Sequence, residues 1–351
     1  MTVNLTSSVI QETQEPYRPR MALLFRGNMA QKPFKTFTEQ IEILRSRNMI
    51  ITEECKAIQI LSEVNYYNLI NAYKNPFLTR DSSGNIQQPE TYVQNCHLKD
   101  LYAFYCLDRE LRGYFLNYML RFEKHLKTIC AYKFSEKYPN DYSYLNISNY
   151  SHDKKDFDSV LKNMANISNE ISRNIDPKNM NSVSYYHSQH DSIPLWVLIN
   201  HLTIGNVSYF LRALDVGLRD AISREFSDLY KVSYSKSDKI GHEELLEIVK
   251  LVNFFRNACA HDRMFLNYYL NKPIKKSIFA KFFPSTILFK GRTAFDLLCV
   301  LKLVISKDDF SELAGMIHLT FEKYKNQLTC LPIFDIIQSS GFTRNWKDIL
   351  K

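Results

Sequence analysis

The segment from His97 to about Lys137 carries the longest helical pattern in the chain, with apolar side chains recurring mostly at three- and four-residue steps. A helix of this kind buries its apolar stripe under other elements, so it predicts a fold organised about one central helix. Only 9 glycines and 11 prolines occur among 351 residues, and no regular succession of strands is visible. The sequence therefore predicts an all-α fold.

Further helices and loops are predicted along the chain. Thr36 and Glu39 form a capping-box pattern that begins the first helix, and Pro194 suits the first turn of another. Helices are expected from Thr36, from Thr52 and over residues 156–173, 195–199, 207–214, 243–259, 293–305 and 313–324, with a break at Gly205. Loops are expected over residues 80–88, 138–151 and 176–192. The helix over 243–259 is expected to yield near Ala260 and to resume through Phe265 and Tyr268.

Three regions are expected. Residues 1–31 are polar and aperiodic, which is typical of a flexible arm. Residues 32–95 form an N-terminal helical segment, and residues 96–351 form a helical domain with a loop-rich insertion around 138–192.

Charge and cysteine usage restrict the class of protein. Lys and Arg number 45 against 37 Asp and Glu, a formal net charge of +8, which favours a polyanionic partner without demanding one. The seven cysteines are scattered, with no Cys-x-x-Cys pair, as in a reduced cytoplasmic protein. The best apolar run, residues 295–305, is short and contains Asp296 and Lys302, so no membrane span is expected.

Several kinds of site are disfavoured. There is no glycine-rich phosphate loop, no Gly-x-Ser-x-Gly elbow and no pair of metal-binding carboxylates. His187 and His190 are spaced to share a helix face, but Asp191 is the only obvious third ligand and no thiolate is near. We therefore expect no metal and no cofactor.

The segment Arg256-Asn257-Ala258-Cys259-Ala260-His261 is the strongest candidate for chemistry. An arginine can hold a phosphate with two parallel hydrogen bonds, and a histidine can transfer a proton near neutral pH. Residues five apart on a continuous helix point about 140° away from each other, so a break between the two would bring them together. This spacing arises about once by chance in such a chain, and the alternative is a surface arginine and a helix-capping histidine.

A second basic face lies on the predicted central helix. It contains Arg121, Lys124, His125 and Lys127, and it echoes the Arg…His pair with only three intervening residues. We interpret it as an RNA-contacting or a structural face.

Several ordered blocks resemble one known family: the abortive-infection proteins of the D and F type in bacterial phage defence, within the HEPN superfamily of helical ribonucleases. The blocks are Lys32-Pro33 with Thr36-Phe37, Glu39-Gln40-Ile41 and Leu44; Tyr66-Tyr67; Pro194-Leu195-Trp196 with Gly205; Arg256 to His261 with Arg263 and Asn267; and Gly341 to Trp346. The last block departs from the family pattern, since Thr343 stands where proline is expected.

The resemblance implies a HEPN-like helical bundle and an Arg-x4-6-His ribonuclease site at Arg256 and His261, with Asn257 in the polar position after the arginine. Two motifs often combine across a dimer in such proteins, and one occurs here, which implies a homodimer. The expected reaction is metal-independent RNA cleavage through the 2′-hydroxyl. Arg263 and Asn267 would support the cleft, or would only form a salt bridge and a helix-end hydrogen bond.

The partners implied are RNA, as substrate and as the structured non-coding RNA beside which some relatives work. A non-catalytic module that binds RNA or sequesters a phage protein is the alternative. A third possibility is a toxin held by an RNA or protein antagonist. Because a pure binding surface has little need of a titratable group, the presence of His261 favours the enzyme.

Overall fold

The computed structural model describes residues 33–176, 178, 180–283 and 287–350, so the predicted arm over 1–31 lies outside the described residues. Within these ranges the chain is all-α, which confirms the predicted fold class: there are isolated β-bridges but no named strand. The α-helices are α1 (Phe37–Ser46), α2 (Glu54–Val64), α3 (Leu98–Lys137), α4 (Phe157–Asn174), α5 (Ser182–Gln189), α6 (Leu195–Leu198), α7 (Ile204–Ala213), α8 (Val216–Tyr234), α9 (His242–Ala260), α10 (Ala294–Val304), α11 (Lys307–Lys325), α12 (Ile333–Ile336) and α13 (Trp346–Ile349). Shorter π and 3-10 turns are η1 (Tyr67–Asn71), η2 (Asn75–Phe77), η3 (Ser143–Leu145), η4 (Ile147–Asn149), η5 (Lys154–Asp156), η6 (Lys276–Phe279) and η7 (Gln338–Ser340).

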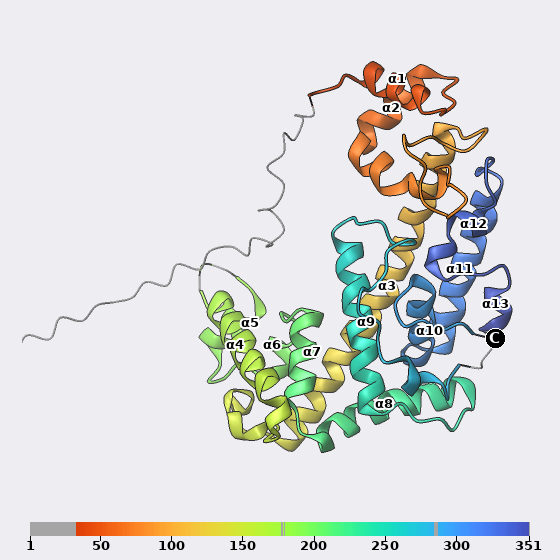
Figure 1. Ribbon diagram of the computed structural model, residues 1–351. Coiled ribbons are helices and arrows are strands. Elements are labelled where there is room, and N and C mark those ends of the chain that lie inside the picture. The colour runs from red at the N-terminus through yellow and green to blue at the C-terminus, as the bar shows by residue number, and fades with distance from the viewer. Residues whose placement is uncertain (1–32, 177, 179, 284–286, 351) are drawn as a thin grey trace, which may run out of the picture.

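The 40-residue helix α3 is the central element, as its apolar pattern predicts. It packs against α6, α8, α9, α10 and α11, and it buries Leu111, Phe115, Phe122 and Leu126 completely or nearly so. Helices α1 and α2 lie near its N-terminal end, α4 to α7 gather near its C-terminal end, and α9 runs beside it (Figure 1). Because α3 is long, the N-terminal helices and the later helices all lie along this one helix.

Helix α1 begins as predicted. The Glu39 carboxylate accepts a hydrogen bond from the backbone N–H of Thr36 at 2.8 Å, and the Glu39 N–H donates to the Thr36 hydroxyl at 3.3 Å. This reciprocal pair satisfies two backbone donors that the first turn leaves open. Ile41 and Leu44 are fully buried.

Two predictions about the middle of the chain were wrong, and one helix was missed. Gly205 does not break a helix, because it lies in the first turn of α7, which is capped by Thr203. The segment expected to be a loop over 176–192 contains α5, whose first N–H groups donate to the side chain of Asn181. Helix α8 was not expected, and it packs against α3, α9 and α10.

The C-terminal block packs into the bundle. Gly341 has a φ of +84°, and a Cβ at this position would lie 2.6 Å from the Thr293 hydroxyl oxygen, so only glycine fits. The following Phe342 and Trp346 are buried and meet the Phe321 ring edge to face. The predicted boundary near residue 96 stays a prediction, because α3 contacts both η1 and the later helices.

Candidate functional site

Helix α9 carries the Arg256 to His261 segment and is fixed along its length. Its apolar face buries Leu245, Ile248, Val252 and Phe255 against α3, α7, α8 and α10. At its start, the Glu244 carboxylate accepts a hydrogen bond from the Gly241 N–H at 3.1 Å. The helix is therefore a rigid platform for the residues at its C-terminal end.

The helix ends at Ala260, immediately before the histidine. The N–H of Arg263 donates to the carbonyl of Ala258 at 3.0 Å, and the N–H of Asp262 donates to the carbonyl of Cys259 at 3.3 Å. Asp262 has a φ of +53°, which is the left-handed residue that this type of helix end requires. The exposed His261 is the C-cap residue. The predicted end of the helix near Ala260 is thus confirmed, whereas the predicted resumption was wrong, because residues 265–268 form a turn and not a helix.

Two polar residues of α3 hold the segment that follows the histidine. Arg112, which is 5% exposed, donates to the carbonyl of Arg263 at 2.8 Å and pairs with the Asp262 carboxylate at 2.5 Å. Asp108, fully buried, accepts from the N–H groups of Phe265 at 2.9 Å and Leu266 at 2.6 Å. It also accepts from the Tyr73 hydroxyl at 2.9 Å. These contacts fix the backbone beside His261.

Burial raises the pKa of Asp108 from 3.8 to about 6. The folded protein therefore holds a proton between these values that the unfolded chain releases, so the stabilisation is present at low pH and is lost as the pH rises through 6. Two pKa units correspond to about 3 kcal/mol of unfolding free energy. We expect Asp108→Asn to remove this component. Denaturant unfolding between pH 4 and pH 7 should show the wild type losing stability relative to the variant. Parallel profiles for the two proteins would contradict this.

Arg256 contacts α3 through an acidic side chain. Its Nε lies 3.4 Å from Glu123 Oε2, and Lys127 Nζ lies 2.8 Å from the other oxygen, Glu123 Oε1. Glu123 is 7% exposed, Lys127 11% and Arg256 28%. In the part of the chain that the structure describes, the two terminal nitrogens of Arg256 have no protein partner. Neither Arg256 Nε nor Glu123 Oε2 has a hydrogen-bond partner among the described residues, so the contact between them is an ion pair on one side of the guanidinium that leaves its outer nitrogens available.

Arg256 and His261 do not contact each other within the described residues. The helix between them is continuous, so they stay about 140° apart around the axis and about 7.5 Å apart along it. The His261 imidazole also has no side-chain partner among the described residues. A single copy therefore presents a cation and an imidazole on different sides of one helix end.

The other motif residues have local partners. The Asn257 amide donates to Asn253 Oδ1 at 3.2 Å. Arg263 donates to the Tyr268 hydroxyl at 3.2 Å. Asn267 accepts from the Ser339 hydroxyl at 2.5 Å and donates to the carbonyl of Ile336 at 3.4 Å, so it joins this segment to α12 and η7. Their roles in a cleft stay predictions.

Cys259 does not offer a reactive thiolate. Burial raises the pKa of its thiol to about 12, so the sulfur stays protonated at neutral pH. The chemistry available at this end of α9 therefore belongs to the arginine and the histidine.

The basic residues of α3 face different neighbours. Arg121 pairs with Asp309 of α11 and lies over the Tyr118 ring. The His125 ring packs 5.0 Å from that of Phe226, and burial lowers its pKa. Lys127 pairs with Glu123, and Lys124 is exposed. A shared RNA-contacting role for these four residues stays a prediction.

Sequence reasoning missed three residues that build the site: Asp108, Arg112 and Glu123. The pairs Asp108 and Arg112, and Glu123 and Lys127, each lie four residues apart on α3, a spacing common to exposed ion pairs. The useful signal was an acid within an otherwise apolar stripe: Asp108 lies four residues after Phe104 and three before Leu111, and Glu123 lies four after Met119 and three before Leu126.

Comparison with known proteins supports one family. A family model described as "Abi-like protein" matches residues 59–267, which is more than half of the chain. No curated protein and no solved structure matches the chain. The matched range contains Tyr66-Tyr67, Pro194-Leu195-Trp196 and the segment from Arg256 to Asn267. Among the described residues, no helix has both the length and the apolar character needed to cross a bilayer.

Proposed function

Because the chain belongs to the Abi-like protein family, we propose that it acts in abortive-infection defence against phage, as a metal-independent HEPN-type endoribonuclease in the cytoplasm. One observation carries the proposal. The Nε of Arg256 lies against the Glu123 carboxylate while the terminal nitrogens stay available, and an exposed His261 is held at the same helix end. A guanidinium with free donors can bind a phosphate, and an imidazole at the same helix end can transfer a proton.

The substrate's 2′-hydroxyl is the nucleophile in this reaction. A base removes its proton, the 2′-oxygen forms a bond to the adjacent phosphorus, and the bond from phosphorus to the 5′-oxygen breaks. The 5′-oxygen takes a proton from an acid as it leaves. The products are a 2′,3′-cyclic phosphate and a 5′-hydroxyl. Arg256 stabilises the negative charge that grows on the phosphate oxygens, and His261 serves as the base or the acid.

A homodimer supplies what one copy lacks. The reaction needs a base and an acid together with the phosphate contact, whereas this helix end of one chain offers His261 alone among the described residues of the motif, on the side away from Arg256. A twofold axis near the end of α9 would bring the arginine of one copy beside the histidine of the other. RNA, and a structured non-coding RNA if one is bound, would then contact both copies, with Lys124 as an exposed cation nearby.

The ends of the cleaved RNA test the reaction directly. We expect purified protein to leave 2′,3′-cyclic phosphate and 5′-hydroxyl ends, and to leave DNA of the same sequence intact because DNA lacks the nucleophile. End-specific ligation and sequencing of RNA from cells that produce the protein would identify these ends and the target. Products with 5′-phosphates, or equal cleavage of DNA, would rule out this mechanism.

A further inference from the structure

The chain that follows His261 is rich in positive charge. Between Arg263 and Phe295 the sequence contains no Asp or Glu, whereas it contains Arg263, Lys272, Lys275, Lys276, Lys281, Lys290 and Arg292. Residues 284–286, which lie outside the described ranges, are Pro, Ser and Thr and add no charge. Tyr and Phe residues are interleaved with these cations. We call residues 263–292 the basic segment.

The basic segment runs back along the row of α9 residues that ends at His261. The Tyr268 ring stacks on that of Phe254, with the ring centres 4.9 Å apart and the planes 3° from parallel. Further on, the N–H of Lys275 donates to Glu247 Oε2 at 3.2 Å. Glu247, Phe254 and His261 follow one another at seven-residue steps, and such positions drift by only about 20° per step around a helix. The segment therefore begins beside the imidazole and continues for about 20 Å along one side of α9 (Figure 1).

The two arms of the basic segment lie side by side. The N–H of Leu270 donates to the carbonyl of Arg292 at 2.9 Å, and the N–H of Ile274 donates to that of Gly291 at 2.9 Å. Gly291 has a φ of +70°, and a Cβ there would lie 2.9 Å from Ile274 Cγ1, so glycine permits this approach. Lys272, between Leu270 and Ile274, thus lies across from the stretch that carries Arg292.

The acids of α9 neutralise only part of this charge. Lys281 Nζ lies 2.6 Å from Glu244 Oε1, and Lys275 Nζ lies 4.0 Å from Glu243 Oε2. With the described residues, no ion pair is formed by Arg263, Lys272, Lys290 or Arg292. Their charge is therefore available to an anionic partner.

The first acid after the basic segment serves the main chain. Asp296, which is 1% exposed, accepts hydrogen bonds at 2.8 Å from the N–H groups of Lys290, Arg292 and Thr293. The carboxylate thus folds the second arm of the segment through backbone contacts and forms no ion pair with the side chains of that arm.

Tyr269 and Arg292 place an aromatic surface and a cation together. Tyr269 is 46% exposed, and the Arg292 guanidinium lies 4.4 Å from the centre of its ring. Aromatic rings and guanidinium planes both stack on nucleobases when these are unpaired. The main-chain hydrogen bond between Leu270 and Arg292 holds the two side chains close to each other. A nucleotide would therefore meet a stacking surface and positive charge at one place.

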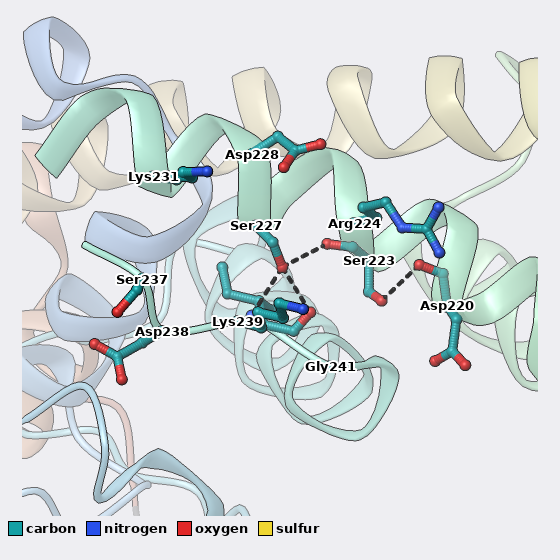
Figure 2. A pocket seen from close by; sticks show the side chains of 11 residues that line it. Asp220, Ser223, Arg224, Ser227, Asp228, Lys231, Ser237, Asp238, Lys239 and Gly241 are labelled. Carbon is teal, nitrogen blue, oxygen red and sulfur yellow. Dashed lines mark hydrogen bonds between the residues drawn. The ribbon is translucent and has the colours of Figure 1, made fainter. Parts of the chain in front are cut away.

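The cavity between α8 and the loop before α9 lacks such an excess of charge. Its volume is about 510 Å³, and its charged lining residues are Asp220, Asp228 and Asp238 with Arg224, Lys231 and Lys239 (Figure 2). We call it the balanced pocket. Lys231 and Lys239 are exposed, as Lys272 and Lys290 are, so this pair of lysines provides a matched control.

We propose that the basic segment holds a single strand of RNA beside His261, with one base stacked at Tyr269 and Arg292 and with neighbouring phosphates at Arg263, Lys272 and Lys290. The inference rests on the proposed function and adds to it the path of the substrate strand. Stacking on an aromatic side chain requires an unpaired base, which favours a single strand over a duplex. An acidic protein would use the cations but would leave the exposed aromatic ring without a role.

Binding of a short, fluorescently labelled single-stranded RNA tests the stacking contact. The full chain with His261→Ala is used, so that the RNA stays intact. Adding Tyr269→Ala should weaken binding at least about fivefold, and Tyr269→Phe should keep it within about twofold, because a phenylalanine ring also stacks. The control Tyr132→Ala removes another exposed tyrosine that lies 5.4 Å from a lysine ammonium, and it should change binding by less than about twofold. An RNA duplex of the same sequence should bind at least about fivefold more weakly than the single strand.

The salt dependence of binding tests the phosphate contacts. In the same His261→Ala chain, K272Q/K290Q should reduce the slope of log binding constant against log salt concentration by about 1.4, since each phosphate contact of a single strand contributes about 0.7. K231Q/K239Q removes two lysines of the balanced pocket and should leave the slope unchanged.

The outcomes separate this proposal from the ribonuclease proposal. If Tyr269→Ala and K272Q/K290Q weaken binding as expected while the wild type leaves RNA intact, the basic segment still holds RNA and only the cleavage reaction fails. If the wild type cleaves RNA and these two variants bind it unchanged, the basic segment is not the path of the strand. The proposal is also overturned if the His261→Ala chain binds no RNA, if the control variants lose as much binding, or if poly-glutamate of equal charge competes as strongly as RNA, which would indicate an acidic protein partner.

Discussion

Replacing His261 with alanine is expected to slow RNA cleavage by about 10²- to 10⁴-fold, which is the usual contribution of a positioned acid or base. The imidazole is exposed and has no side-chain partner in the described residues, so its removal breaks no contact that holds the fold. Unfolding free energy should therefore change by no more than about 0.5 kcal/mol. Initial cleavage rates on a defined RNA, together with phage-protection assays in cells, measure the effect.

A matched control is His187→Ala, which removes another exposed histidine from α5, away from the end of α9. This variant should cleave RNA and protect cells as the wild type does. Equal cleavage by His261→Ala would remove this histidine from the mechanism. Loss of cleavage with full protection against phage would instead support the sequestering function, because defence would then not need the chemistry.

Replacing Arg256 with alanine is expected to slow cleavage by about 10²- to 10³-fold, the effect of losing one preorganised donor to a developing charge. Arg256→Lys should restore little of this rate. Arginine contacts Glu123 through Nε and still presents two parallel donors to a phosphate, whereas the single ammonium nitrogen of lysine cannot do both. Lys127 lies 2.8 Å from Glu123 in the wild type and is unchanged in both variants, so we expect the buried carboxylate to keep one cation. Rates of both variants, compared with the exposed control Arg224→Ala, measure the effect. Full activity of Arg256→Ala would contradict the assigned role.

Mixing the two inactive variants tests the composite cleft. If each cleft joins Arg256 of one copy to His261 of the other, a dimer of one Arg256→Ala copy and one His261→Ala copy keeps one complete cleft of two. Random pairing makes half of the dimers mixed, so an equal mixture should recover about a quarter of the wild-type rate. A mixture as inactive as its components would show that both residues must come from one chain, or that all four are needed together.

Local signals made much of the fold predictable. The capping box at Thr36 and Glu39 and the apolar recurrence through α3 are properties of neighbouring residues, and both appear in the structure as expected. Helix α8 carried a readable signal, since Asp215 caps it and Leu218, Ile222, Phe226 and Tyr230 recur at every fourth residue, all buried. Its absence from the prediction reflects a missed pattern and not a tertiary effect.

The site was less accessible from sequence because it depends on contacts between distant segments. Arg256 and Glu123 are separated by more than a hundred residues, and their approach follows from the packing of α9 on α3. The end of α9 near Ala260 was predicted, but the expected resumption of a helix through Phe265 and Tyr268 was wrong for a different reason. The left-handed position after α9 is occupied by Asp262 instead of glycine, so the usual marker of a helix end is missing.

The hydrogen bond between Tyr73 and Asp108 connects the N-terminal segment to the main chain that follows His261. Tyr73 belongs to the segment after η1. The same Asp108 carboxylate accepts hydrogen bonds from the N–H groups of Phe265 and Leu266, a few residues beyond His261. A change in the position of Tyr73 would therefore alter the contacts that fix the main chain beside His261.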